Sequence, residues 1–212
     1  MKQTPKVNYQ LILDKIIQEL VNENKRPRLL LHSCCAPCSS YVLEYLTKYF
    51  DITVFYYNPN ISPEEEYRYR VEEQKRLISE MCPQVSFIEG RYEPERFAKM
   101  AEGLENEPER GIRCHKCYRL RLEEAAIEAK RGGYDFFTTT LSISPQKDSA
   151  VLNDIGREIS DKHGIAYLFS DFKKKGGYKR SIELSAQFSL YRQSFCGCTH
   201  SRRRRACAPD SR

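Results

Sequence analysis

Short apolar segments alternate with longer amphipathic segments along this chain, and that alternation restricts the possible folds. The predicted strands cover residues 28–33, 51–57, 85–89, 135–140 and 165–169. The predicted helices precede, separate and follow these strands, over residues 8–24, 41–49, 62–81, 94–104, 114–131, 149–163 and 181–190, on the evidence of apolar spacing and of helix start and stop signals. This order predicts β-α-β units, and hence an α/β fold with a parallel sheet and helices on both faces. Ligands of such sheets bind beyond the carboxyl ends of the strands.

The length of 212 residues predicts a single domain. We expect residues 1–27 to form a leading helix and residues 28–170 an α/β core. Residues 171–212 are expected to form a helical segment with a C-x-C pair and a basic tail. No apolar run approaches the roughly 20 residues of a membrane span, and no signal-peptide pattern follows Met1. We therefore expect a cytoplasmic protein without a membrane partner.

Six of the nine cysteines fall in three close pairs, which are Cys34 with Cys35, Cys114 with Cys117, and Cys196 with Cys198. In a reducing cytosol, clustered cysteines bind metal or do redox work more often than they form structural disulfides. The first pair directly follows the first predicted strand. Four thiolates from the first two pairs can bind zinc or hold an iron–sulfur cluster. Adjacent cysteines favour the cluster, because its corners lie farther apart than the ligand positions of one ion.

The cysteines also allow other interpretations. C-x-x-C at the start of a helix is typical of a redox pair as well as of a metal site. C-x-C suits a strained, reducible disulfide or two ligands of one metal, with Gly197 permitting the sharp turn, but it can also only tie down the tail. Cys38 is either a further thiol, on a second metal, or a small buried residue. We expect Cys82 in the core, Cys207 as a surface thiol, and His32 as a core histidine.

The formal net charge is +6, and the basic residues are clustered. Residues 173–180 contain five lysines and arginines, and residues 202–205 are four arginines. Such clusters form either a solvated face or contacts with phosphates, whose neutralisation releases counterions.

Several motifs occur together in a characteristic order. They are LHSCCAPCSS at 31–40, VFYYNPNI at 54–61, RCHKCYRLR at 113–121, TTTLSISPQK at 138–147 and CGC at 196–198. Together they resemble the cobalamin-independent epoxyqueuosine reductase family, QueH, over about residues 28–206.

The resemblance implies a fold related to the HUP, or adenine nucleotide alpha hydrolase-like, group, with a helical C-terminal metal-site extension. The implied reaction is the last step of queuosine biosynthesis, in which two electrons remove the epoxide oxygen of epoxyqueuosine at the tRNA wobble position. The implied partners are that tRNA and an unidentified one-electron donor protein. ATP use is not expected, because no Ser-Gly-Gly-x-Asp-Ser loop follows the first strand.

Carried over residue by residue, the family assigns four cysteines to a [4Fe-4S] cluster, which are Cys34, Cys35, Cys114 and Cys117. Cys196 and Cys198 become the catalytic redox pair. The family also implies an additional mononuclear iron, for which Cys38, Cys196 and Cys198 are candidate ligands. A proton donor is needed as well, and the candidates are Asp148, Tyr118 and His32. Two alternatives remain open at this point: a cluster-dependent tRNA sulfurtransferase and a zinc-stabilised RNA-binding module.

Overall fold

A five-stranded parallel sheet forms the centre of the computed structural model, which describes residues 7–201. The strand order is β3-β2-β1-β4-β5, with every pairing parallel. The strands are β1 (Arg28–His32), β2 (Asp51–Tyr56), β3 (Ser86–Glu89), β4 (Phe136–Thr139) and β5 (Ala166–Tyr167). The predicted parallel sheet is therefore confirmed. Two predicted features, the arginine run at 202–205 and Cys207, lie outside the described residues.

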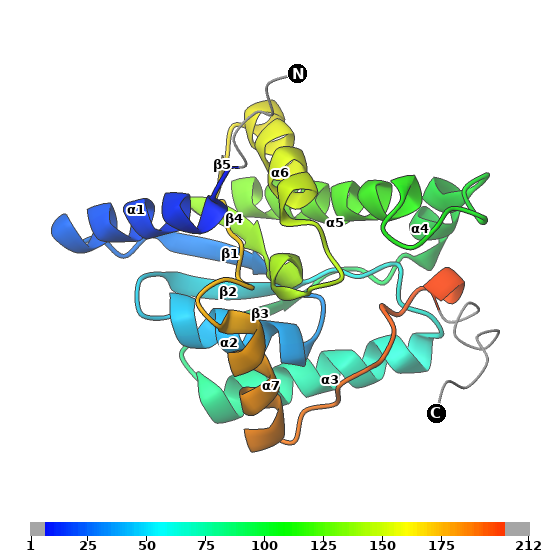
Figure 1. Ribbon diagram of the computed structural model, residues 1–212, viewed down its shortest axis with the longest axis horizontal. Helices are drawn as coiled ribbons and strands as arrows, with labels where there is room; N and C mark the ends of the chain where they lie inside the picture. The colour runs from blue at the N-terminus through cyan, green and yellow to red at the C-terminus, as the bar shows by residue number, and fades with distance from the viewer. Residues whose placement is uncertain (1–6, 202–212) are drawn as a thin grey trace.

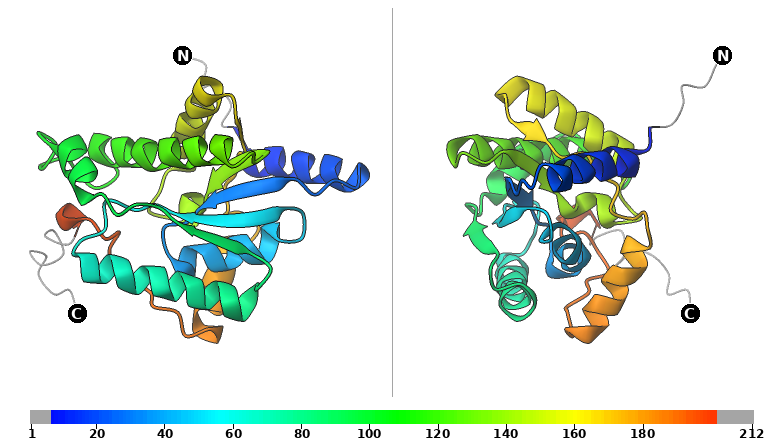
Figure 2. Two further views of the ribbon diagram at one scale, coloured as in Figure 1. Left: turned by 180° about the vertical axis from the view of Figure 1, so that it is seen from behind. Right: turned by 90° about the vertical axis from the view of Figure 1, so that its left-hand side faces the viewer.

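Helices cover both faces of this sheet, as predicted. They are α1 (Tyr9–Asn22), α2 (Ala36–Leu46), α3 (Glu64–Met81), α4 (Pro94–Ala101), α5 (Ile112–Arg131), α6 (Ser149–His163) and α7 (Gly177–Gln187). Figure 1 shows α5 and α6 above the sheet and α2, α3 and α7 below it, and Figure 2 shows the same layers from two other sides. The chain thus forms a three-layer α/β sandwich.

The central strand β1 divides the core between the two faces. Leu29 and Leu31 pack with α2 in one buried cluster, whereas Leu30 packs with α5 and α6 in another. Successive side chains of a strand point to opposite faces, and all three leucines have no exposed surface. This continuous apolar run is typical of a parallel strand buried on both sides.

The start of α2 differs from the prediction in a way that matters for the cysteines. We predicted a helix from Tyr41 with Ser39 or Ser40 as cap, but α2 begins at Ala36, with Pro37 in its first turn. Proline is tolerated there, because the first amides of a helix have no intrahelical partner. Cys38 therefore lies in the helix. The Ser39 hydroxyl instead lies within hydrogen-bond distance of two acceptors, the Gln74 side-chain oxygen at 2.8 Å and the Cys35 carbonyl at 3.0 Å.

The strand order places a reversal of direction between β1 and β4. The chain moves outward from β1 to β2 and β3, then returns through α5 to β4 on the other side of β1. In such sheets the carboxyl ends of the two central strands bound a crevice where ligands bind. Ser33 and Cys34 follow β1, and Thr140 follows β4. The Cys34 amide donates to the Thr140 hydroxyl over 3.3 Å, which joins the two strand ends.

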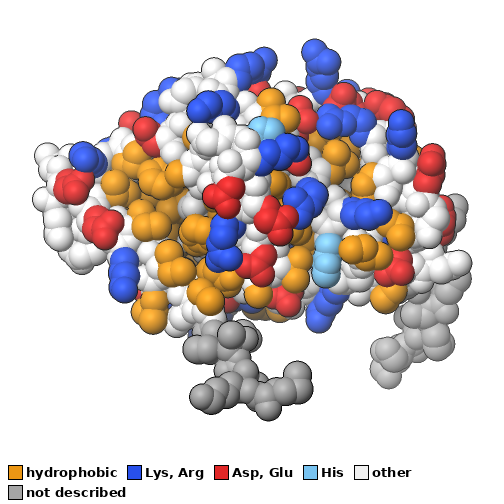
Figure 3. All heavy atoms as spheres, turned by 90° about the horizontal axis from the view of Figure 1, so that it is seen from above, with side chains coloured by type: hydrophobic (Ala, Val, Ile, Leu, Met, Phe, Trp, Pro, Cys, Tyr) orange, Lys and Arg blue, Asp and Glu red, His pale blue; other side chains and the backbone are white. Residues whose placement is uncertain are grey.

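Within residues 7–201, no helix is long and apolar enough to cross a membrane. The face over α1, α5 and α6 carries acidic and basic side chains next to one another (Figure 3).

Of the predicted C-terminal helical segment, α7 is present. Its role as part of a metal-site extension, the division into residues 1–27, 28–170 and 171–212, and the relation to the HUP group stay predictions.

Candidate active site

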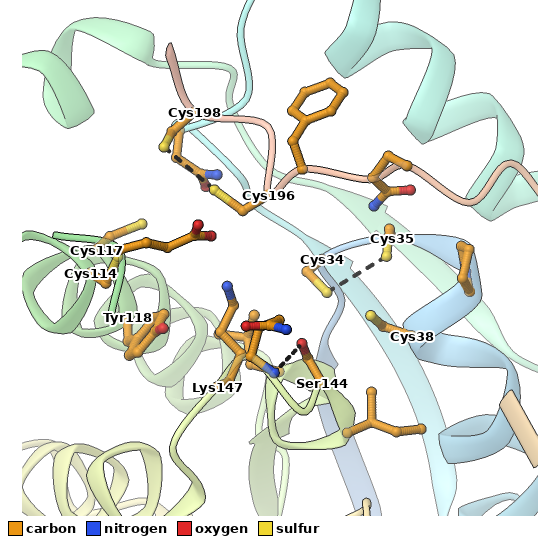
Figure 4. Close-up of a pocket in the computed structure, with 18 of the residues that line it drawn as sticks. Cys34, Cys35, Cys38, Cys114, Cys117, Tyr118, Ser144, Lys147, Cys196 and Cys198 are labelled. Carbon is orange, nitrogen blue, oxygen red and sulfur yellow. Dashed lines mark hydrogen bonds between the residues drawn. The ribbon is translucent and has the colours of Figure 1, made fainter. Parts of the chain in front are cut away.

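Seven cysteines line one cavity of about 280 Å³ at the carboxyl edge of the sheet. They come from three segments that are far apart in the sequence, and they comprise all six paired cysteines together with Cys38. Figure 4 shows the three groups of sulfurs around a common space. The eighth described cysteine, Cys82, is buried in the core as predicted. All eight are free thiols, with no disulfide among them.

The first wall of the cavity is the junction of β1 and α2. Cys35 is the N-cap of α2, and Cys38 lies in its first turn. The sulfurs of Cys34, Cys35 and Cys38 lie within 4.8 Å of one another, and Cys34 Sγ is 3.8 Å from Cys35 Sγ. Hydrogen bonds with Cys35 and Cys38 hold the pKa of the Cys34 thiol well below its ordinary value. This group can therefore present a thiolate, the form that binds metal.

The second wall is the start of α5. Gly111 is the N-cap of this helix, so Cys114 lies in its first turn, as predicted, and Cys117 follows one turn later. Residues three apart on a helix lie side by side, and both thiols reach the cavity. The backbone amide of Arg110 donates to Cys114 Sγ over 3.3 Å. Two helix N-termini, those of α2 and α5, thus adjoin the cavity, and their positive ends favour thiolate.

The third wall is the C-x-C segment after α7. Cys196 Sγ and Cys198 Sγ lie 3.4 Å apart, and the interaction with Cys198 holds the pKa of Cys196 well below its ordinary value. Gly197 has φ +106°, a conformation that strongly favours glycine. Its carbonyl accepts a hydrogen bond from the Ser62 amide over 3.0 Å, which fixes the segment beside the loop after β2.

The compact trio of sulfurs differs from the set assigned by family resemblance. The resemblance pairs Cys34 and Cys35 with Cys114 and Cys117, whereas the group of three described sulfurs that all lie within 4.8 Å of one another belongs to Cys34, Cys35 and Cys38. Figure 4 shows Cys114 and Cys117 across the cavity from Cys34 and Cys35. All four predicted cluster ligands therefore line the same cavity, and this cavity separates the pair Cys34 and Cys35 from the pair Cys114 and Cys117.

A buried cation tests whether this space suits an anionic group. Arg121 is only 4% exposed and donates to the Cys117 carbonyl and to the Asn58 side chain. Among residues 7–201 no carboxylate forms an ion pair with it. Burial acts to lower its pKa, but Cys117 and Cys34, in their ionised form, outweigh that effect and raise it. An unpaired buried charge is costly. Thiolates bound to a metal would supply the missing counter-charge, so the donor set fits such a group.

The remaining cavity lining is also cationic. Its basic side chains are Arg70, Arg113, Arg121, Lys147 and Arg192, whereas Glu109 is the acidic lining residue. Arg70 is 2% exposed and forms an ion pair with Glu66 over 2.7 Å, and its guanidinium also lies beside the Cys196 carbonyl. The excess of positive charge favours anionic occupants of the cavity and of its mouth.

The three proton-donor candidates fall in different places. His32 has no exposed surface, and its ring nitrogens contact the Thr139 hydroxyl at 2.9 Å and the Tyr57 carbonyl at 3.1 Å. Burial lowers its pKa to about 3, so it is a neutral core histidine, as one of our two interpretations had it. Asp148 caps α6 by accepting from the Ala150 amide over 2.8 Å. Tyr118 lines the cavity, and burial raises its pKa to about 12.

Sequence reasoning missed three cations of the site. Arg121 lies one turn after Cys117 on the same helix, so a helical spacing from the cysteines marks its position. Lys147 is the last residue of the family motif at 138–147, but the prediction assigned it no role. Arg70 lies in a helix rich in charged residues, and nothing in its spacing separates it from its neighbours.

The fold and the cavity together define a class of protein: a parallel α/β protein with a cysteine-built site of the metal-binding type at its strand ends. Comparison with known families is more specific. The family described as epoxyqueuosine reductase QueH matches residues 29–204. The chain belongs to this family, which is a family of oxidoreductases.

Curated relatives can be aligned with this chain over most of its length. An epoxyqueuosine reductase QueH of Staphylococcus epidermidis is 44% identical over 199 residues, covering 91% of this chain and 84% of the relative. That of Streptococcus pyogenes is 40% identical over 205 residues, covering 95% and 80%. That of Thermotoga maritima is 35% identical over 179 residues, covering 82% and 89%. A solved deacetylase of teicoplanin biosynthesis overlaps 66% of this chain and 65% of its own at a TM-score of 0.37 and 9% identity, which supports no inference.

Proposed function

We propose that this protein reduces epoxyqueuosine to queuosine in tRNA, the last step of queuosine biosynthesis. The observation that carries the proposal is the convergence of seven thiols on one cavity in a member of this reductase family. Removal of the epoxide oxygen requires two electrons and two protons, and it yields an alkene and water. A site for this reaction must store electrons, hold the substrate and deliver protons.

The proposed electron store is a [4Fe-4S] cluster bound by Cys34, Cys35, Cys114 and Cys117. When bound, such a cluster accepts and passes on single electrons. The donor set supports it, because four thiols of these two pairs face each other across the cavity and Arg121 offers a buried positive charge. The single electrons would come from a one-electron donor protein.

Cys196 and Cys198 are proposed as the catalytic pair. Two thiols that form a disulfide release two electrons and two protons, which balances the conversion of an epoxide to an alkene and water. Their 3.4 Å separation is compatible with bond formation after a small movement. An alternative role is to bind, with Cys38, an additional mononuclear iron, since all three thiols line the same cavity.

The tRNA is proposed to enter at the mouth of the cavity. Tyr178, which is 36% exposed, and the exposed Arg192 lie there, and Arg192 is held by hydrogen bonds to Ser181 and Ser185. Of the basic cluster at 173–180, Lys174 and Lys179 form no ion pair with a described carboxylate. A modified base turned out of its stack can enter such a cavity, while cations at the mouth contact phosphates.

The test compares three single variants purified without oxygen. Cys34→Ala is expected to lose bound iron and sulfide and all activity, whereas Cys196→Ala keeps the iron and loses turnover. Cys82→Ala is the matched control, because this thiol lies in the core outside the cavity. Activity is the loss of one oxygen from the modified nucleoside, followed by mass spectrometry of the digested tRNA.

Metal and sulfide analysis together with mass spectrometry of the tRNA also distinguishes this function from the two alternatives, a tRNA sulfurtransferase and a zinc-stabilised RNA-binding module. A sulfurtransferase would add sulfur to the nucleoside, and a zinc-stabilised RNA-binding module would contain zinc, no sulfide and no turnover. Full turnover of Cys196→Ala would rule out the catalytic pair, although the cluster assignment would stand.

A further inference from the structure

The side chain of Lys147 projects into the cavity between the walls formed by the cysteines (Figure 4). Its backbone position is fixed on both sides. The Lys147 amide donates to the Ser144 carbonyl over 3.1 Å, which closes a turn after β4. The next residue, Asp148, caps α6. The backbone from which this side chain extends is therefore fixed on both sides.

The ammonium of Lys147 has no hydrogen-bond acceptor in the part of the chain that the structure describes. No oxygen of residues 7–201 accepts a hydrogen bond from it, and no described carboxylate pairs with it. Its contact is with the Tyr118 ring, whose centroid is 5.9 Å from Nζ. Burial acts to lower the pKa of Lys147, but Tyr118 and the thiols of Cys196 and Cys114 outweigh that effect and raise it. The group thus remains an ammonium with three hydrogen-bond donors, which normally find acceptors when they are shielded from water.

We propose that Lys147 donates a hydrogen bond to the epoxide oxygen of the substrate and stabilises the negative charge that develops there. This inference rests on the proposed function. In the ground state the epoxide oxygen is a neutral acceptor. When the first carbon–oxygen bond breaks, the bonding electrons go to the oxygen, which becomes an alkoxide. A fixed cation beside that oxygen interacts more strongly with the alkoxide than with the epoxide, and this difference lowers the barrier.

The balance of the reaction is unchanged by this role. The carbons of the epoxide receive two electrons from the reductant of the proposed function, the oxygen leaves as water with two protons, and a carbon–carbon double bond forms. Lys147 contributes a hydrogen bond and a charge, and its own proton stays on Nζ. The role therefore requires no additional reactant.

A purely structural role, in which Lys147 only offsets thiolate charge, makes different predictions. Arg121 already lies buried among Cys117, Cys34 and Cys196 and contributes a fixed positive charge there. Loss of a second structural cation would reduce bound iron and stability together. Loss of a substrate-binding cation would leave both unchanged and slow only the chemical step.

The experiment measures single-turnover reduction with saturating tRNA, tRNA affinity and iron content of the whole protein. Lys147→Met is expected to lower the single-turnover rate by about 100-fold or more, as loss of one oxyanion donor does elsewhere. Iron content, visible spectrum and tRNA affinity stay within twofold of the parent. Lys147→Arg keeps the charge and is expected to recover at least tenfold over Lys147→Met. Lys48→Met, at an exposed lysine that precedes β2 and does not line the cavity, is the matched control and keeps the full rate.

Two results would overturn the proposal. One is a Lys147→Met rate within threefold of the parent. The other is a fall in rate that is matched by an equal fall in iron content in both Lys147 variants, which assigns the residue a structural role. Absence of deoxygenation by the parent protein would instead refute the proposed function, so the two failures are distinguishable.

Discussion

Substitution of Gly197 by alanine tests the geometry of the C-x-C segment directly. An added Cβ would lie 3.0 Å from Ile61 Cγ1 and 3.2 Å from an Arg70 nitrogen, at φ +106°. The matched control is Gly103→Ala, because Gly103 has φ +73° and nothing within 4 Å of an added Cβ. Both variants incur the cost of a positive φ, about 1–2 kcal/mol. Only Gly197→Ala adds overpacking against two buried side chains, about 1–2 kcal/mol more.

The free energy of unfolding should therefore fall by about 1–2 kcal/mol in Gly103→Ala and by about 2–4 kcal/mol in Gly197→Ala. Urea unfolding of proteins with equal iron content measures both values. Because Gly197 separates the two thiols of the proposed catalytic pair, its variant should also lose turnover, while the control keeps it. Equal unfolding curves for the two variants, with full turnover in both, would refute our account of this segment.

Substitutions at two further residues test the charge of the site. Arg121→Met removes the buried counter-charge of the thiolates, so iron should be lost to a competing chelator at about 10- to 100-fold lower chelator concentration, whereas Arg121→Lys should lie between that variant and the parent. Equal iron retention in all three proteins would contradict the role of this cation. Arg192→Ala should weaken tRNA binding and reduce the slope of log affinity against log salt by about one, because one phosphate contact is lost. A filter-binding titration over several salt concentrations measures that slope, and an unchanged slope would place the tRNA elsewhere.

Elements with strong local patterns were predicted well. The predicted helix at 149–163 has the same bounds as α6, because Asp148 provides a capping side chain and Gly164 a left-handed C-cap. The parallel sheet also followed from the alternation of strands and helices. The predicted start of α2 lay five residues too late, because the serines that suit a helix cap instead form hydrogen bonds within the helix and to Gln74.

The position of the first cysteines could be predicted from the sequence, but the contacts between distant segments could not, because they depend on the tertiary structure. Placement of Cys34 at the carboxyl end of a strand follows from the strand pattern alone. The meeting of the three cysteine segments depends on the strand order, which local patterns do not encode; the resemblance supplied it. The cations Arg121, Lys147 and Arg70 were missed because charged residues are usually solvated. Their burial beside thiols is a property of the tertiary structure.

The pairing of β1 with β4 has a consequence for how the protein matures. Leu30 of β1 lies opposite Phe137 of β4, although the chain makes two strands and several helices between them. Insertion of β4 next to β1 also places α5, and with it Cys114 and Cys117, near the carboxyl edge of the sheet, where Cys34 lies. The proposed cluster would therefore have its full ligand set only after β4 pairs with β1, and a defect in that pairing would leave the protein without the cluster.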